Sequence, residues 1–334
     1  MYQGNQTSKV TEFILLGLTE NPKWKLILFM IFLTIYLTTW LGNLTIIFTV
    51  VLVQHLHTPM YFLLANLAVI DISDSTVTAL KMLRGLLSQP NTISYDWCMT
   101  QIFFFHLTGS SVDFLLVVMA VDRYVAIYKP LQYLLIMNQR VCIYLVAGAW
   151  LGGFVHSIVQ IGIIIQLPFC GPNVLNNFYC DIPQVIKLAC TNTYVTELLM
   201  VCNSGLIVAV MFFVLLISYT IILVKIRTHV TDGKHKAIST CAAQIIVLTL
   251  NFGPAIFIYD RPFRVFPGDK IFSMMYTLIT PMLNPMIFTL RNTDMKNAIK
   301  KLGRKMLPLE SGIFGEVAHV FPTRSHVLSV HVNS

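Results

Sequence analysis

Three carboxylates lie inside long apolar stretches of this sequence. Asp71 and Asp74 share one stretch, and Asp113 lies in the next. A charge within hydrocarbon is costly, so such a residue is a candidate to bind a proton or a small cation such as Na⁺. For Asp71 the alternative is a structural role, with Asn43 and Asn284 as hydrogen-bonding partners at a similar depth. The residue types leave both interpretations open.

A charged pair, Asp122-Arg123, is followed by Tyr124 where the third apolar stretch ends. Taken alone, an acid beside an arginine at a membrane boundary is an ordinary interfacial feature. The motif that surrounds the pair, described below, gives it a different interpretation.

Motifs of common enzyme classes are missing. The sequence has no His-Glu-x-x-His, no Gly-x-Ser-x-Gly and no phosphate-binding glycine-rich loop. His106 and His156, both in apolar stretches, have no evident nucleophile or metal ligand as a partner. We therefore predict neither an enzyme nor a metal-binding cluster.

The composition indicates that lipid is the solvent of this chain. Of the 334 residues, 56% are apolar and 11% are charged, whereas about a quarter of an average soluble domain is charged. The net charge of +8 comes from basic residues in short segments between apolar runs. Such segments are typical of membrane topology signals and of contacts with anionic lipid, rather than of nucleic-acid binding.

Seven apolar runs are long enough to cross a bilayer as helices, since a span needs roughly 20 residues. They are too long and too continuously apolar for barrel strands. We therefore predict an all-α membrane protein, with a seven-transmembrane helix bundle over residues 26–290. The spans are 26–53, 59–80, 97–128, 141–168, 198–224, 237–259 and 271–290.

The odd number of spans places the two termini on opposite sides of the membrane. The segments on the side of the C-terminus hold 14 Lys and Arg, against 9 on the other side. This difference favours a cytoplasmic C-terminus and an extracellular N-terminus, residues 1–25, in a multi-pass protein of the plasma membrane. Asn5 begins an Asn-Gln-Thr glycosylation acceptor, and no cleavable signal peptide is evident.

Four cysteines fall on the proposed outer side. Cys98 begins the third span, and Cys170, Cys180 and Cys190 lie between the fourth and fifth spans. Four cysteines in an oxidising compartment suggest two disulfides, for which spacing alone allows three pairings.

Residues 291–304 form a juxtamembrane segment with a helix expected over 293–304. Apolar side chains fall on one face at helical spacing, and basic side chains fill the rest. An amphipathic helix along the inner membrane surface and an ordinary basic flank of the last span both fit. Residues 305–334 have no clear periodicity and are expected to form a disordered cytoplasmic tail. The apolar residues are Met295, Ala298, Ile299 and Leu302; the basic ones are Lys296, Lys300, Lys301 and Arg304.

Several short motifs, in order and in register from about residue 11 to 304, resemble the odorant (olfactory) receptors, a family of rhodopsin-like G-protein-coupled receptors. The run MAVDRYVAIYKPLQY at 119–133 resembles their signature at the end of helix three. Two further runs resemble the family's helix entries: LHTPMYFL at 56–63 for helix two, and KAISTC at 236–241 for helix six. Two others resemble motifs inside helices: Ser218-Tyr219 in helix five, and PMLNPMIF at 281–288 in helix seven.

The chain departs from the family pattern at several positions. The family usually has Tyr at the position of Val121, Cys at Tyr128, His at both Gln132 and Gln244, and Tyr at Phe288. The family's helix-three Glu is Val112 here, with Asp113 next to it. One residue rotates a helix by about 100°, so it stays open whether Asp113 joins Asp71 and Asn284.

The resemblance implies an odorant receptor that binds small volatile molecules within the helix bundle. Binding would activate a stimulatory olfactory G protein, which raises cyclic AMP. It also implies disulfides Cys98–Cys180 and Cys170–Cys190. The implied ligand residues are His106, Gly109, Ser110, Asn203, Ser204, Ile207, Phe252, Ala255, Ile256, Tyr259, Met274 and Thr277. The implied switch residues are Asp122, Arg123, Tyr124, Tyr219, Asn284, Pro285 and Phe288.

The implied ligand residues are mostly apolar, with a few hydrogen-bonding groups and no carboxylate or lysine, so a charged ligand is not expected. His106 either bonds a carbonyl or hydroxyl of the ligand or is satisfied by a helix neighbour. The alternative function is an ion-coupled transporter or channel, since three carboxylates lie within spans. No internal repeat supports that alternative.

Overall fold

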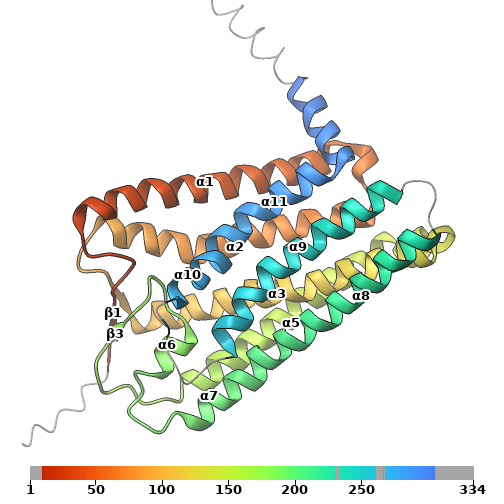
Figure 1. Ribbon diagram of the computed structural model, residues 1–334. Helices are drawn as coiled ribbons and strands as arrows, with labels where there is room; N and C mark the ends of the chain where they lie inside the picture. Colours follow the sequence, from red (N-terminus) through yellow and green to blue (C-terminus); the bar gives the residue numbers. More distant parts are fainter. Residues whose placement is uncertain (1–9, 230–233, 261–265, 267, 305–334) are drawn as a thin grey trace, which may run out of the picture.

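The computed structural model describes residues 10–229, 234–260, 266 and 268–304. Within these residues, seven helical segments are long and apolar enough to cross a membrane (Figure 1), which confirms the predicted fold class. They are α1 (Pro22–Leu52), α2 (Pro59–Leu87), α3 (Tyr95–Tyr128), α5 (Gln139–Ile164), α7 with η3 and α8 (Tyr194–Met200, Val201–Leu206, Ile207–His229), α9 (Lys234–Tyr259), and α10 with η4 and α11 (Asp269–Met274, Met275–Ile279, Thr280–Arg291). Short connecting helices are η1 (Gln54–Leu56), η2 (Pro130–Gln132), α4 (Tyr133–Ile136) and α6 (Ile182–Ile186).

Polar side chains at the helix starts explain several boundaries. The Asn21 side chain accepts a hydrogen bond from the Lys23 amide, and Pro22 stands in the first turn of α1. Asn138 caps α5 in the same way. α2 runs to Leu87, past the predicted end of the span at residue 80, and the Lys81 ammonium in this extension donates to the Thr92 carbonyl at 2.6 Å.

Two spans contain a wide π-helical turn that the uniformly apolar sequence did not indicate. One is η3 in the fifth span, and the other is η4 in the seventh. A π-turn adds a residue to one helical turn and changes which side chains face inward beyond it. Both turns lie among the predicted ligand residues.

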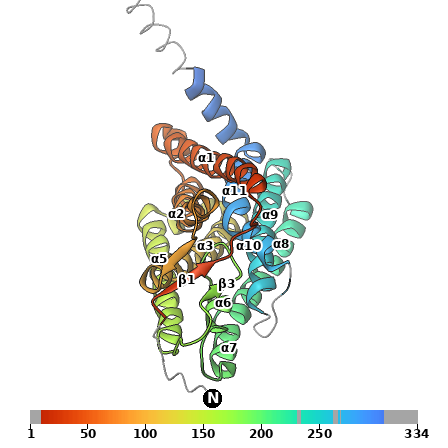
Figure 2. The ribbon, with the colours of Figure 1, turned by 90° about the vertical axis from the view of Figure 1, so that its left-hand side faces the viewer.

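A small sheet lies across one end of the bundle (Figure 2). Its central strand β1 (Glu12–Leu15) pairs antiparallel with β2 (Thr92–Ser94) and parallel with β3 (Val174–Leu175). The sequence analysis expected no strand in residues 1–25. We call this end of the bundle the sheet end, and the opposite end, where α3 finishes, the Arg123 end.

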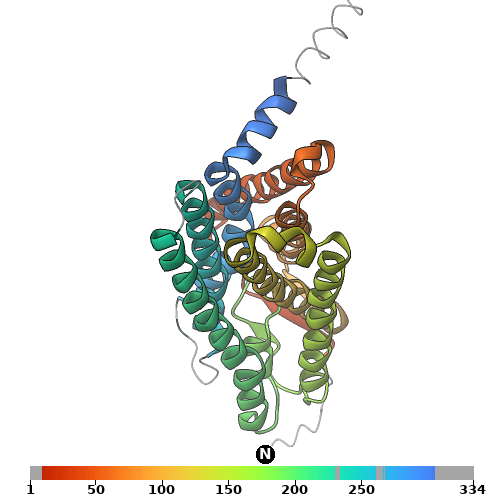
Figure 3. The same ribbon diagram turned by 90° about the vertical axis from the view of Figure 1, so that its right-hand side faces the viewer.

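Within the described residues, two large apolar clusters fill the interior, one toward each end, and a third, small cluster consists of Val125, Met137 and Cys142. The cluster toward the Arg123 end includes Leu63, Leu115 and Phe252. The cluster toward the sheet end includes Phe105 and Tyr259. Viewed along the bundle, the helices enclose α3, which packs against neighbours on both sides (Figure 3). α3 therefore connects the two clusters and can carry residues to both ends.

Residues 293–304 are helical, and the helix leaves the bundle sideways, across the long axis of the spans (Figures 1 and 3). Met295 and Ala298 on its apolar face are buried. Lys296, Lys300 and the other basic residues of this helix are exposed. This is the sidedness of a helix that lies along a membrane surface. The glycosylation acceptor Asn5 and the tail 305–334 lie outside the described residues.

Candidate functional site

At the Arg123 end, Asp122 holds Arg123. The Asp122 carboxylate is 1% exposed and accepts two hydrogen bonds from Arg123, at 3.0 Å from Nε and 2.5 Å from Nη2. A third hydrogen bond, at 2.7 Å, comes from the Tyr133 hydroxyl of α4. A buried carboxylate needs such partners, because charge taken out of water is costly unless paired and hydrogen-bonded. We call these three residues the latch.

Tyr124 was predicted among the switch residues, but it does not belong to the latch. Its side chain is 45% exposed and stacks on Tyr128, with ring centroids 4.5 Å apart. Successive helical residues point about 100° apart, so Tyr124 faces outward when Asp122 faces inward. The sequence motif includes Tyr133, yet its contact with Asp122 depends on the η2 turn, which the sequence analysis did not anticipate.

Tyr219 of α8 is buried and donates a hydrogen bond to Oε1 of Gln244 in α9, at 2.9 Å. Gln244 is one of the departures from the family pattern, and here it joins the fifth span to the sixth. Phe288, another departure, is buried in the apolar cluster of this half. The structure therefore holds α9 against α8 through a side-chain contact, close to the latch.

In the middle of the bundle, Asp71 contacts Asn284, one of the two partners that the structural alternative named. The Asn284 amide lies 3.1 and 3.0 Å from the two carboxylate oxygens. Asn43 does not contribute in the way expected. Its amide donates to the backbone carbonyls of Thr39 and Pro281, because α1 and α11 pack closely at this level. Asn43 therefore connects these two helices instead of binding Asp71.

The other two intramembrane carboxylates are Asp74 of α2 and Asp113 of α3. The Thr108 hydroxyl donates to Asp74 at 2.6 Å, and both residues are buried. Asp113 is also buried and interacts electrostatically with Asp74 and with Tyr276. Asp74 in turn interacts with Asp71. Among the hydrogen bonds of the described residues, none joins Asp113 to Asp71 or Asn284; Asp71 bonds Asn284, and Asp74 bonds Thr108.

Most of the predicted ligand residues come together between α3, η3, α9 and η4. The rings of His106 and Tyr259 lie 5.8 Å apart. At Gly109 an added Cβ would stand 2.5 Å from the Tyr276 hydroxyl, so a larger residue there would displace that hydroxyl from α3. Also buried are Ser110, Ser204, Phe252, Ala255 and Thr277, while Asn203, Ile256 and Met274 are partly buried.

Ile207 was predicted to face the ligand but points away from the bundle, with 43% of its side chain exposed. The reason is the π-turn η3, which ends immediately before it. Beyond this wide turn, the inward position falls to Val208, which packs against both apolar clusters. A regular helix would have kept Ile207 on the same face as Asn203.

Beside the predicted residues lies a polar group that the sequence analysis missed. His156 of α5 accepts or donates a hydrogen bond with Ser110 at 2.8 Å. Gln160, one turn further along α5, donates to Ser204 at 2.5 Å. The sequence signal was available: His156 and Gln160 are four residues apart in an apolar helix and so share one face.

His106 itself is 5% exposed, and its Nε2 atom has no hydrogen-bond partner among the described residues. Its neighbours are mainly rings, from Phe105, His156 and Tyr259. A buried polar atom without a partner is destabilising. A ligand that hydrogen-bonds this nitrogen would remove the penalty.

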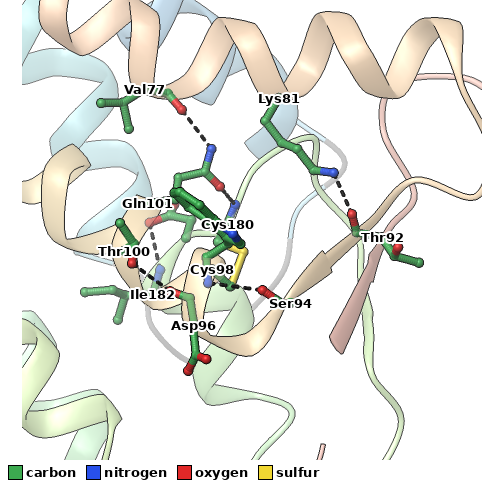
Figure 4. Close-up of a disulfide and its surroundings, with 12 residues drawn as sticks. Val77, Lys81, Thr92, Ser94, Asp96, Cys98, Thr100, Gln101, Cys180 and Ile182 are labelled. Carbon is green, nitrogen blue, oxygen red and sulfur yellow. Dashed lines mark hydrogen bonds between the residues drawn. A yellow bond between two sulfur atoms is a disulfide. The ribbon is translucent and has the colours of Figure 1, made fainter. Parts of the chain in front are cut away.

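Both disulfides implied by the family resemblance are present. Cys98 at the start of α3 is bonded to Cys180, and Cys170 to Cys190, with Cα atoms 5.5 and 5.8 Å apart. Figure 4 shows that Gln101 supports the first bond by accepting a hydrogen bond from the Cys180 amide at 2.9 Å. The disulfide thereby fixes the loop after α5 to the start of α3, above the ligand residues.

Next to this disulfide, Asp181 of the same loop is buried. The Tyr259 and Tyr179 hydroxyls donate to its two oxygens at 3.0 and 3.2 Å. Burial raises the pKa of the Asp181 carboxyl from its ordinary 3.8 to about 6, and these hydrogen bonds oppose the rise. The hydrogen bond from Tyr259 therefore holds the loop to α9, and keeping Asp181 charged in this buried position costs free energy.

The pKa of Asp181 predicts a pH dependence of stability. Because its pKa is higher in the folded protein, the folded protein binds a proton that the unfolded chain does not. Stability from this group therefore increases as pH falls through about 6 toward 3.8. In thermal unfolding of the solubilised protein, the midpoint should rise from pH 7.5 to 5.5 by more than in Asp181→Asn. Equal pH profiles would contradict the assignment.

Comparison with known proteins agrees with these features. A family model described as olfactory receptor matches residues 32–305. The chain is 53% identical to human olfactory receptor 4E1, over 90% of this chain and 96% of the relative. It is 55% identical to human olfactory receptor 4N5, over 88% and 95%. It is 51% identical to mouse olfactory receptor 4E2, over 91% and 98%.

The family match runs from within the first span to beyond the seventh and confirms the resemblance, while the transporter or channel alternative receives no support. Members of the matching family are receptors and not enzymes. The chain is a multi-pass membrane protein that belongs to the olfactory receptor family of G-protein-coupled receptors.

Proposed function

We propose that this receptor binds small, mostly apolar volatile molecules between α3, η3, α9 and η4. The observation that carries the proposal is the buried Nε2 of His106, which lies among aromatic rings and has no hydrogen-bond partner in the part of the chain that the structure describes. Such a site suits a ligand with an apolar body and one carbonyl or hydroxyl group, because the body fills the apolar surroundings and the polar atom bonds the imidazole. The candidate ligand residues include no carboxylate or lysine for a charged ligand.

In this proposal, binding of the odorant activates a stimulatory heterotrimeric G protein of the olfactory type. The G protein contacts the receptor at the Arg123 end. The latch and the Tyr219–Gln244 hydrogen bond are interactions of the resting state. In the active state α9 moves outward, and Arg123 is free to contact Tyr219 and the G protein. An odorant can shift this equilibrium only by its difference in affinity for the two states.

The proposed orientation places the Arg123 end in the cytoplasm of the cell and the sheet end outside, at the plasma membrane. Two disulfides at the sheet end support it, since disulfides persist in oxidising compartments. The excess of Lys and Arg in the segments of the opposite side agrees. A carbohydrate chain on Asn5 is part of the same proposal.

We also propose that a proton or a Na⁺ ion is bound near Asp71. The residues fit either group. Among the described residues, nothing hydrogen-bonds Oδ1 of Asn43 or of Asn284, and both oxygens are buried. Carboxylate and amide oxygens are suitable ligands for a hard cation, and an oxygen acceptor is equally suited to a proton donor.

A cyclic-AMP assay with a panel of volatile compounds, in cells that carry an olfactory G protein, tests the proposed function. For an agonist with a carbonyl or hydroxyl group, we expect His106→Leu to raise the half-maximal concentration about tenfold, as one hydrogen bond of about 1.4 kcal/mol would. Ile207→Ala, at a position that faces outward, should leave potency unchanged. Equal shifts in the two variants would argue against a ligand contact at His106.

A further inference from the structure

The outer surface of the bundle carries a groove between α1, α11 and the helix at residues 293–304. Its volume is about 400 Å³. Leu41 of α1 is 67% exposed, and Met286 and Leu290 of α11 are 44% and 68% exposed. These side chains face away from the bundle, toward the lipid. The groove is therefore separate from the ligand residues, which lie inside.

Close approach of the two helices shapes the groove. At Gly42 an added Cβ would stand 3.0 Å from the Pro285 ring, so glycine permits contact between α1 and α11. Thr45 and Thr289 also line the groove, but each hydroxyl donates to the backbone of its own helix at 2.6 Å. Their hydrogen-bonding capacity is used within the helices. The groove therefore presents a largely apolar surface to its occupant.

One end of the groove is cationic. Lys296 and Lys300 line it, one turn apart on the helix that leaves the bundle sideways. The nearest carboxylate on that helix, Asp294, interacts with Tyr61 of α2 instead. The two ammonium groups are thus available to a negatively charged group at the level where the helix runs along the membrane surface.

We propose that this groove binds an anionic phospholipid, with an acyl chain between α1 and α11 and the phosphate-bearing headgroup on Lys296 and Lys300. The dimensions agree. From Thr38 to Thr45 the groove follows α1 for about 10 Å, which lies within the roughly 15 Å of hydrocarbon in one leaflet. The proposed orientation of the receptor places this end in the cytoplasmic leaflet, where anionic lipids are concentrated.

The chemistry distinguishes this occupant from others. A free phosphate would leave the apolar walls uncovered, and a sterol or a neutral phospholipid would leave two ammonium groups without a counter-charge. An anionic phospholipid satisfies both parts at once. Because the groove joins α1, α11 and the terminal helix, the bound lipid would stabilise their packing by binding the folded state.

The test uses the purified full-length receptor and native mass spectrometry with added phosphatidylserine or phosphatidylcholine. We expect phosphatidylserine to bind more tightly and Lys296→Gln/Lys300→Gln to weaken it about tenfold, with thermal unfolding as a check of folding. The matched control is Lys301→Gln/Arg304→Gln, which removes the same charge from the same helix without touching the groove. It should change binding less than twofold, on the order of experimental scatter.

Any one of the following results would contradict the proposal. Equal losses in the two double variants would indicate diffuse attraction to the helix. Equal binding of phosphatidylcholine would remove the role of the headgroup charge. Competition by glycerophosphoserine as strong as by the whole lipid would remove the role of the acyl chain. Thr45→Trp, or Met286→Trp if the first does not fold, should obstruct the groove; unchanged binding in the folded variant would place the lipid elsewhere.

Discussion

Replacement of Arg123 by alanine is expected to abolish the cyclic-AMP response to every agonist while leaving the receptor at the cell surface. Arg123 is the residue of the latch that Asp122 would release and that the G protein is proposed to contact. Its side chain is 15% exposed and its guanidinium contacts Asp122. The truncation therefore removes the coupling group, while the Tyr133 hydroxyl still donates a hydrogen bond to the buried Asp122 carboxylate. The measurement is cyclic AMP against odorant concentration, with surface receptor quantified by antibody.

The control for this prediction is Arg140→Ala. Arg140 lies in the exposed first turn of α5 at the same end of the bundle, so the variant loses the same charge from the same face. Its response should match that of the unsubstituted receptor. A normal response in Arg123→Ala would show that the latch is not the coupling element, and a loss in both variants would indicate a general charge effect.

The second large effect is expected from Cys98→Ser, which should nearly eliminate folded receptor at the cell surface. The bond between Cys98 and Cys180 spans 82 residues, and that between Cys170 and Cys190 spans 20. Chain entropy alone gives about 4.5 kcal/mol for the longer separation and about 3.3 kcal/mol for the shorter. These are upper bounds, because the membrane already restricts the unfolded chain.

Loss of each disulfide would also affect a different part of the structure. Loss of the first frees the loop that covers the ligand residues from α3, whereas loss of the second loosens only the loop itself. Surface receptor should therefore fall further in Cys98→Ser than in Cys170→Ser. Cys202→Ser is the control, since that cysteine is free and exposed. A loss of surface receptor in Cys202→Ser as large as that in Cys98→Ser would show that the effect is not specific to the disulfide.

The spans could be predicted from the sequence because burial in lipid imposes one simple rule, a long apolar run, on every helix. Depth in the membrane named both Asn43 and Asn284 as partners of Asp71; Asn284 contacts Asp71, whereas Asn43 donates to backbone carbonyls. The disulfide pairing could not be derived in this way. Spacing allowed three pairings, and the family resemblance supplied the one found.

The failures have local causes. Ile207 was placed on the inner face by regular helical spacing, and the π-turn before it shifted that face by one residue. Tyr124 was grouped with its neighbours in a motif, although adjacent helical residues face different directions. The strand β1 is only four residues long and depends on partners far along the chain. Such pairing leaves no signal in local sequence.

The position of β1 has a consequence for how the receptor is made. β1 leaves the ribosome first, yet its parallel partner near residue 174 follows only after four spans have been synthesised. At 5–20 residues per second, the edge of β1 that pairs with β3 waits roughly 10 to 30 s, whereas the partner of its other edge, β2, is made earlier. An open strand edge pairs readily with a wrong partner. Biosynthesis of this receptor is therefore expected to depend on a factor that shields the nascent N-terminus until β3 has emerged.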